Sequence, residues 1–225
     1  ANTITFNGGT LLTTNAAAGT SRNVTLNAGG GTIQTNTADV TFSGVFSGTG
    51  ALTKTGANVL TLSGANSYTG ATNVNAGTLQ AAASSINSSS VVTVAGNSTF
   101  NLTSGTMTQT FTNSGTINVY GSLNPAVVAT NNNVINIKSG GAMQIANSIT
   151  GSGTIANESG AVLTLTSGGT TNPITNANGG ILSVTGSVTS AGITNSGNMS
   201  IAGSVSGSGT IANESGAVLT LSSGG

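Results

Sequence analysis

Apolar and polar residues alternate in short bursts along the whole chain. Residues 3–13 (TITFNGGTLLT), 91–102 (VVTVAGNSTFNL) and 153–165 (GTIANESGAVLTL) each contain two short apolar bursts in which a polar residue alternates with Val, Ile, Leu or Phe, and a run of polar and small residues separates the two bursts. A period of two over a few residues is typical of half-buried strands, and the intervening Gly, Asn and Ser are typical of turns. Only residues 79–86 (LQAAASSI) suggest one helical turn. The sequence therefore predicts an all-β chain.

The stretch VLTLSG, which begins at residue 59, illustrates how each burst should face. Leu60 and Leu62 are expected to point inward and Thr61 outward, because successive side chains of a strand point to opposite sides. Tyr68, a few residues later, is expected to cover a corner of the structure. An alternative role for Tyr68 is a platform on which a sugar stacks.

The bursts recur at a nearly constant distance of about 19 residues, which is the length of one solenoid coil. Dividing the chain length of 225 by this distance predicts about twelve coils. In a parallel β-helix the coils stack at about 4.8 Å, and the crossover rule makes the superhelix right-handed. The burst starts are Ile4, Val24, Val40, Val59, Val74, Val92, Ile117, Ile135 and Ile155.

One repeat is nearly literal. Residues 151–169 return as residues 207–225 with a single change, and the two copies begin about three coil lengths apart. This repetition favours one continuous right-handed parallel β-helix over residues 1–225, with about 19 residues per coil. A β-sandwich is the competing fold, and disorder is a further alternative for a chain so rich in Gly, Ser, Thr and Asn.

Charge is nearly absent. The chain has three basic and three acidic residues, no His and no Cys. Stacked coils place like residues on top of each other. Stacked Asn or Thr residues can form hydrogen bonds along the axis, whereas stacked like charges repel each other. The composition argues against nucleic-acid binding, disulfides and Cys or His metal sites. No apolar run approaches the length of a membrane-spanning helix, so we expect no membrane insertion by this segment.

Residues 48–80 (GTGALTKTGANVLTLSGANSYTGATNVNAGTLQ) closely resemble the passenger-associated repeat of bacterial autotransporters. The resemblance depends on GALTKTG, LTLSGANSYTGAT and VNAGTLQ in that order and spacing. It covers roughly residues 1–125 well and the remainder only in general style. It implies a β-helical passenger exported by type V secretion, in which such repeats help the passenger to fold outside the cell.

Candidate chemistry is sparse. Only Asp39, Glu158 and Glu214 offer carboxylates. The two Glu residues hold equivalent places in the literal repeat, so they should lie about three coils, or roughly 14 Å, apart, which exceeds the spacing for glycoside hydrolysis. We expect all three to be solvated turn residues. Arg22, Lys54 and Lys138 are likewise expected to be dispersed and solvated.

The sequence therefore predicts no catalytic, cofactor-binding or metal site and no cofactor, and it indicates that the chain is not an enzyme. A polysaccharide-degrading β-helix enzyme is the least favoured alternative. The favoured function is a secreted or surface-exposed rod of an autotransporter-like passenger with a scaffold or adhesin role. The alternative is a subunit of an extracellular filament or coat that stacks end to end.

The expected partners are further coils of a longer chain, other copies of this chain, or a glycan or protein on a host or cell surface. The motivation for end-to-end stacking is the zero net charge and the absence of an evident cap at either terminus. The expected location is the bacterial surface or the extracellular medium.

Overall fold

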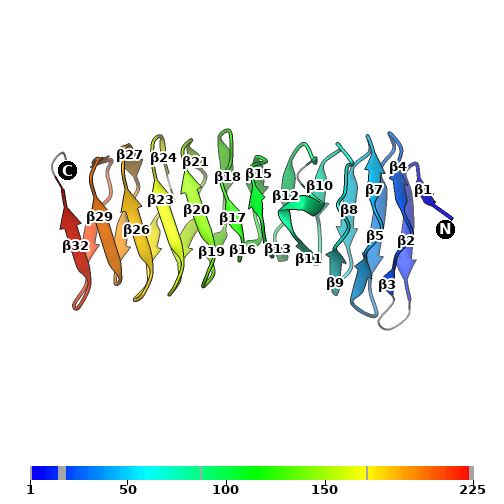
Figure 1. The fold of residues 1–225 in the computed structure, drawn as a ribbon, viewed down its shortest axis with the longest axis horizontal. Helices are drawn as coiled ribbons and strands as arrows, with labels where there is room; N and C mark the ends of the chain where they lie inside the picture. The colour runs from blue at the N-terminus through cyan, green and yellow to red at the C-terminus, as the bar shows by residue number, and fades with distance from the viewer. Residues whose placement is uncertain (1, 15–18, 87, 171, 223–225) are drawn as a thin grey trace.

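The protein is an elongated parallel β-solenoid, with its N-terminus at one end and its C-terminus at the other (Figure 1). The computed structural model describes residues 2–14, 19–86, 88–170 and 172–222. All strand pairs in this part of the chain are parallel, and neighbouring strands belong to successive coils. The all-β solenoid fold is therefore confirmed, and the hand of the superhelix stays a prediction.

Two long sheets run along the rod. Sheet B contains β2 (Gly9–Thr13), β5 (Gly31–Thr35), β8 (Leu52–Thr55), β10 (Thr72–Val74), β12 (Val92–Val94), β15 (Phe111–Asn113), β18 (Ala129–Asn131), β21 (Ile149–Thr150), β24 (Gly169–Thr170), β27 (Ser187–Ser190) and β30 (Ser204–Ser206). Sheet C contains β3 (Gly19–Thr20), β6 (Val40–Phe42), β9 (Val59–Leu62), β11 (Gly77–Ala81), β13 (Ser98–Leu102), β16 (Thr116–Val119), β19 (Val134–Ile137), β22 (Thr154–Asn157), β25 (Ile174–Asn176), β28 (Ile193–Asn195) and β31 (Ile211–Asn213). Each sheet has 11 strands, one fewer than the predicted twelve coils.

Each coil has a third side in addition to its strands in sheets B and C, and different structures form this third position along the chain. Sheet A provides it at first, with β1 (Ile4–Phe6), β4 (Val24–Leu26) and β7 (Phe46–Gly48). Sheet D provides it later, with β14 (Thr106–Met107), β17 (Ser122–Leu123), β20 (Ala142–Ile145), β23 (Val162–Leu165), β26 (Ile181–Val184), β29 (Asn198–Ile201) and β32 (Val218–Leu221). Between them, residues 63–71 and a segment with the short 3₁₀ helix η1 (Ala83–Ser85) take this position. That helix is the turn predicted within residues 79–86.

The strand pairing gives the coil length. Nine successive pairing steps in sheet C lead from Thr41 to Ala212, and the difference between these two residue numbers, divided by nine, is 19. The predicted mean is right although the burst starts lie on different sides of the rod. Val59, for example, lies in sheet C and Val74 in sheet B, and even within sheet C Val40 pairs with Leu60 and not with Val59.

The literal repeat has the predicted offset of three coils. Asn157 pairs with Asn176, Asn176 with Asn195 and Asn195 with Asn213, which holds the equivalent place in the second copy. The last residues of the second copy, 223–225, lie outside the described part of the chain, as does Ala1.

Alternation of side chains builds a single core along the axis. Leu60 and Leu62 are buried as predicted, and the inward positions of successive coils stack Val, Ile, Leu and Phe on each other. Asn also occupies inward positions at the ends of strands. The side-chain amide of Asn157 donates to Asn176, and that of Asn176 donates to Asn195, each at 2.7 Å. In this buried asparagine ladder each amide is paired with the next side-chain oxygen, and only the oxygen of Asn157, at the start of the ladder, has no partner among the described residues.

Candidate functional site

The carboxylates do not form an acid–base pair. Glu158 and Glu214 follow the paired residues Asn157 and Asn213, so three coil spacings separate them, as the repeat predicts. Asp39 is exposed in the N-terminal part of the rod, as predicted, and accepts a hydrogen bond from the backbone of Val59. Among the described residues, no three His, Cys, Asp or Glu side chains are grouped to hold a metal.

Lys54 is fully buried, so the prediction that it is solvated is wrong. It lies at an inward position of β8, between Ile33 and Val74 of the neighbouring coils. Its ammonium group donates to the backbone carbonyls of Thr55, Gly56 and Ala76 at 2.8–2.9 Å. The aliphatic part of the side chain packs in the core, and the ammonium group reaches a corner of the coil. There the three carbonyls provide the hydrogen bonds that water would otherwise make.

Burial lowers the pKa of Lys54 from 10.5 to about 8, while the negative charge of Asp39 acts in the opposite direction. The ammonium is therefore mostly charged at pH 7 and ties two coils together through Thr55, Gly56 and Ala76. Sequence reasoning missed this role, although the alternation of Leu52, Thr53 and Lys54 indicates an inward lysine.

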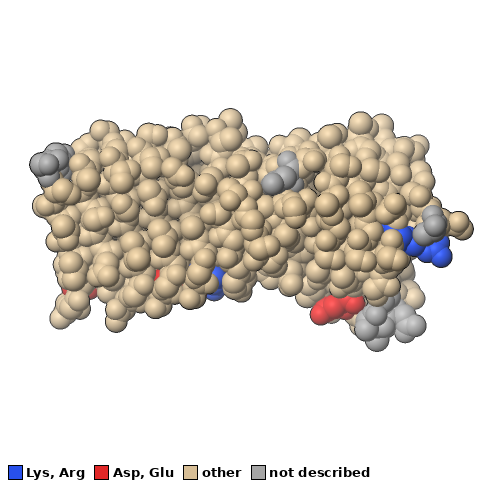
Figure 2. All heavy atoms as spheres, in the orientation of Figure 1, with Lys and Arg blue, Asp and Glu red and all other residues tan. Residues whose placement is uncertain are grey.

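Lys138 is not dispersed, which corrects a second prediction. It forms an ion pair with Glu158, the residue at the same place in the next coil. Both side chains are partly exposed, at 25% for the lysine and 40% for the glutamate, so the pair contributes little to stability. Arg22 is exposed, as predicted. The few charged atoms visible in Figure 2 lie along one long edge and near one end.

Tyr68 packs inside the rod and cannot serve as a platform for a sugar. It is 1% exposed, and its ring lies edge-on to that of Phe46, with centroids 6.4 Å apart. Its hydroxyl shares a hydrogen bond of 2.7 Å with the hydroxyl of Thr72, which donates to Ser89. Burial raises the pKa of Tyr68 to about 12, against a smaller opposite effect of the Thr72 hydrogen bond.

Asn66 joins three coils at the place where sheet A has ended and sheet D has not begun. Its side-chain oxygen accepts from the backbone of Phe46 at 2.8 Å, and its amide donates to the carbonyl of Ser85 at 2.9 Å. Ser85 returns a hydrogen bond to Gly64 at 2.8 Å. The SGANSYTG segment thus replaces a strand with a buried polar network, which sequence patterning alone does not reveal.

The outer side of sheet B carries a regular row of hydroxyl groups. Seven of its eight outward residues in register are threonines, and we call this row the threonine face: Thr10, Thr32, Thr53, Asn73, Thr93, Thr112, Thr130 and Thr150. The corresponding row on sheet C contains Asn101, Asn118 and Asn136, whose amides bond to each other. The two outer faces therefore differ in how far their polar groups are already satisfied.

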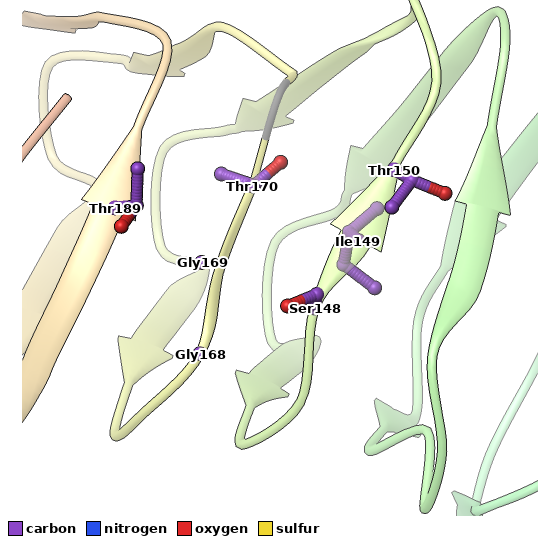
Figure 3. A pocket seen from close by; sticks show the side chains of 7 residues that line it. All are labelled: Ser148, Ile149, Thr150, Gly168, Gly169, Thr170 and Thr189. Atoms are coloured by element: carbon purple, nitrogen blue, oxygen red, sulfur yellow. The ribbon is translucent and has the colours of Figure 1, made fainter.

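A shallow hollow adjoins the end of the threonine face. It has a volume of about 290 Å³ and lies over β21, β24 and β27, where Gly168 and Gly169 contribute no side chains (Figure 3). A second hollow of about 300 Å³ shares Thr170 and Thr189 with it and continues over β30 to Gly207. We call the two together the trough.

Sequence comparison connects one part of this rod to known proteins. Residues 52–81 match the family model of the passenger-associated-transport-repeat, which confirms the resemblance for that stretch. Over 83 residues, 36% of the chain, the sequence is 45% identical to the adhesin BmaC autotransporter of Brucella suis biovar 1 (strain 1330). The match spans 2% of that protein. No solved structure matches the chain significantly. Residues 52–81 are thus similar to a passenger-associated repeat, and they lie within a continuous β-solenoid.

Proposed function

We propose that this chain forms part of the rod of a secreted or surface-exposed bacterial passenger, and that the rod is a scaffold with an adhesive outer surface. The observation that carries the proposal is the match of residues 52–81 to a passenger repeat that is embedded in continuous sheets of parallel strands. The similarity to a protein named as an adhesin supports the adhesive role.

The arrangement of charged groups supports a role without catalysis. Glu158 is paired with Lys138, and Glu214 lies three coil spacings away. The buried ammonium of Lys54 is enclosed by carbonyls and has no contact with the outer surface. Binding through an extended surface needs none of these groups.

The solenoid suits a chain that folds progressively. Each coil contacts mainly its neighbours, so a completed coil provides the template for the next one. Asn66 and Lys54 each bond to neighbouring coils within the matched repeat and its flank. We infer that this repeat is a firmly joined segment on which further coils assemble. Within the described residues, no helical segment has the length and hydrophobicity of a membrane span.

Surface display tests the proposal. The chain is fused between a secretion signal and an autotransporter translocation domain, and its exposure is measured by antibody labelling and protease treatment of intact cells. We expect a protease-resistant, surface-exposed rod. Asn66→Ala should lower the displayed amount or its protease resistance. Ser67→Ala, at an exposed neighbouring position, should leave both unchanged.

Two outcomes would contradict the proposal. The first is a chain that remains inside the cell although the empty fusion is exported. The second is a displayed chain that cells degrade or proteases digest as readily as an unfolded segment. Binding of displaying cells to surfaces, compared with cells that carry the empty fusion, tests the adhesive part separately.

A further inference from the structure

The threonine face has hydroxyl groups that the protein itself does not use. Among the described residues, the side chains of Thr10, Thr32, Thr53, Thr93 and Thr112 make no hydrogen bond. They are half-buried or exposed and repeat at the strand spacing of about 4.8 Å. Each presents a donor, an acceptor and a methyl group to the outside. Such a row can engage a ligand that also carries regularly spaced hydroxyl and C–H groups.

The face is electrically neutral. Neither the threonine face nor the trough includes an Asp, Glu, Lys or Arg, and Lys54 of the same sheet points into the core. An anionic or cationic polymer would find no opposite charge here, and charge complementarity is what favours such ligands. The surface therefore favours an uncharged ligand.

The trough favours a ligand that lies along the rod. It passes over β21, β24, β27 and β30, three strand spacings or about 14 Å, in line with the threonine face. Its lining combines the hydroxyl and methyl groups of threonines such as Thr150 and Thr189 with the bare backbone of Gly168, while Ile149 lies fully buried beneath it (Figure 3). Pyranose rings present the same mixture of hydroxyl edges and C–H faces.

The glycines hold the trough open. A Cβ atom added to Gly169 would lie 2.5 Å from the carbonyl oxygen of Thr189, so β24 can approach β27 this closely only with glycine there. Gly168 has a φ of +73° and would place a Cβ 2.8 Å from the backbone of Asn147. The absence of side chains at this point is thus built into the backbone.

We propose that the threonine face and the trough bind a neutral, linear polysaccharide that lies along the rod axis, with its hydroxyls on the threonine row and one or more sugar rings in the trough. This inference rests on the proposed function and names the ligand class of its adhesive surface. It requires no aromatic platform, consistent with the burial of Tyr68.

Binding is tested with the whole chain by NMR titration of the ¹⁵N-labelled protein with laminarin, dextran and mannan, and with heparin as the anionic comparison. We expect at least one neutral polymer to shift amide signals of sheet B from β18 to β30, and heparin to leave them unchanged. Thr189→Phe places a large side chain in the trough and should weaken binding at least ten-fold. Thr194→Phe, at an exposed position of β28 in the same coil, should leave it unchanged.

Three results would overturn the inference. One is the absence of binding to all three neutral polymers. Another is equal binding by the wild type and Thr189→Phe. The last is shifts confined to other faces, or shifts that depend on protein concentration and reveal self-association. If the rod is displayed on cells yet binds none of the polymers, the ligand assignment fails while the proposed function stands.

Discussion

The buried asparagine ladder should be a major determinant of stability, and Asn176→Ala tests it. Asn176 lies at the end of β25 and is fully buried. Its amide donates to the side-chain oxygen of Asn195 at 2.7 Å and to the carbonyl of Asn198 at 3.1 Å. Its own side-chain oxygen accepts from Asn157 at 2.7 Å. Alanine removes these three bonds together with a weaker one of 3.3 Å from the amide to the carbonyl of Gly180.

The expected cost is about 3 kcal/mol, because each of the three bonds contributes a net 1 kcal/mol or so. The partners bear the loss unequally. Asn157 retains a bond of 2.9 Å to the carbonyl of Ile181, whereas the oxygen of Asn195 keeps only a contact of 3.3 Å with the amide of Gly197. Water cannot readily replace the lost partners, since Asn157 and Asn195 are fully buried.

Urea unfolding followed by circular dichroism measures the cost, and hydrogen exchange locates it. Asn118→Ala is the matched control, because Asn118 also sits in a ladder, with bonds of 2.9 and 3.0 Å, but on the outer face where water can replace them. We expect the control to cost less than about 1 kcal/mol. Equal destabilisation by the two substitutions, or an Asn176→Ala cost below about 1 kcal/mol, would refute this reasoning.

Three further predictions concern charge and backbone contacts. The free energy of unfolding should rise between pH 8 and pH 10.5. The pKa of Lys54 is lower in the folded than in the unfolded chain, so the unfolded chain binds more protons in this pH range. Urea titrations of Lys54→Met should lack this rise. Lys138→Ala should lower stability by no more than about 0.5 kcal/mol, and adding salt should abolish even that difference. Gly186→Ala should destabilise the protein by more than about 2 kcal/mol, because the new Cβ would overlap the carbonyl oxygen of Thr166. Gly140→Ala should cost only about 1 kcal/mol in the same assay, because the space around Gly140 is open and only its φ of +79° is unfavourable for alanine.

Much of the fold is predictable from the sequence because a solenoid repeats one simple rule. The alternation at Leu60, Thr61 and Leu62 marks a strand and its buried side. The coil length follows from averaging the bursts. Assignment of individual bursts to sheets is less reliable, because each coil contains up to three strands and a burst does not reveal its side of the rod. Val59 and Val74 therefore look equivalent in the sequence, although Val59 lies in sheet C and Val74 in sheet B.

The polar interior escaped prediction because residue type was given more weight than position. Lys54 stands two residues after an inward leucine, so strand alternation places it inward, yet an isolated lysine is usually solvated. Asn66 and Ser85 lie one coil length apart, but their hydrogen bond depends on the irregular backbone of residues 63–71. The trough is likewise invisible in the sequence, because it forms where short strands of several coils meet.

The spacing of charges follows from the same geometry as the ladders. In a stacked solenoid each side chain meets the equivalent side chain of the next coil, so a residue must tolerate its own kind or find a complement. Asn does so with one donor group and one acceptor, whereas two carboxylates in contact repel each other. Glu158 accordingly has Lys138 on one side and Ala177 on the other, and Ser196 follows before Glu214 appears. A literal repeat of three coils can therefore contain a glutamate where a repeat of one coil could not.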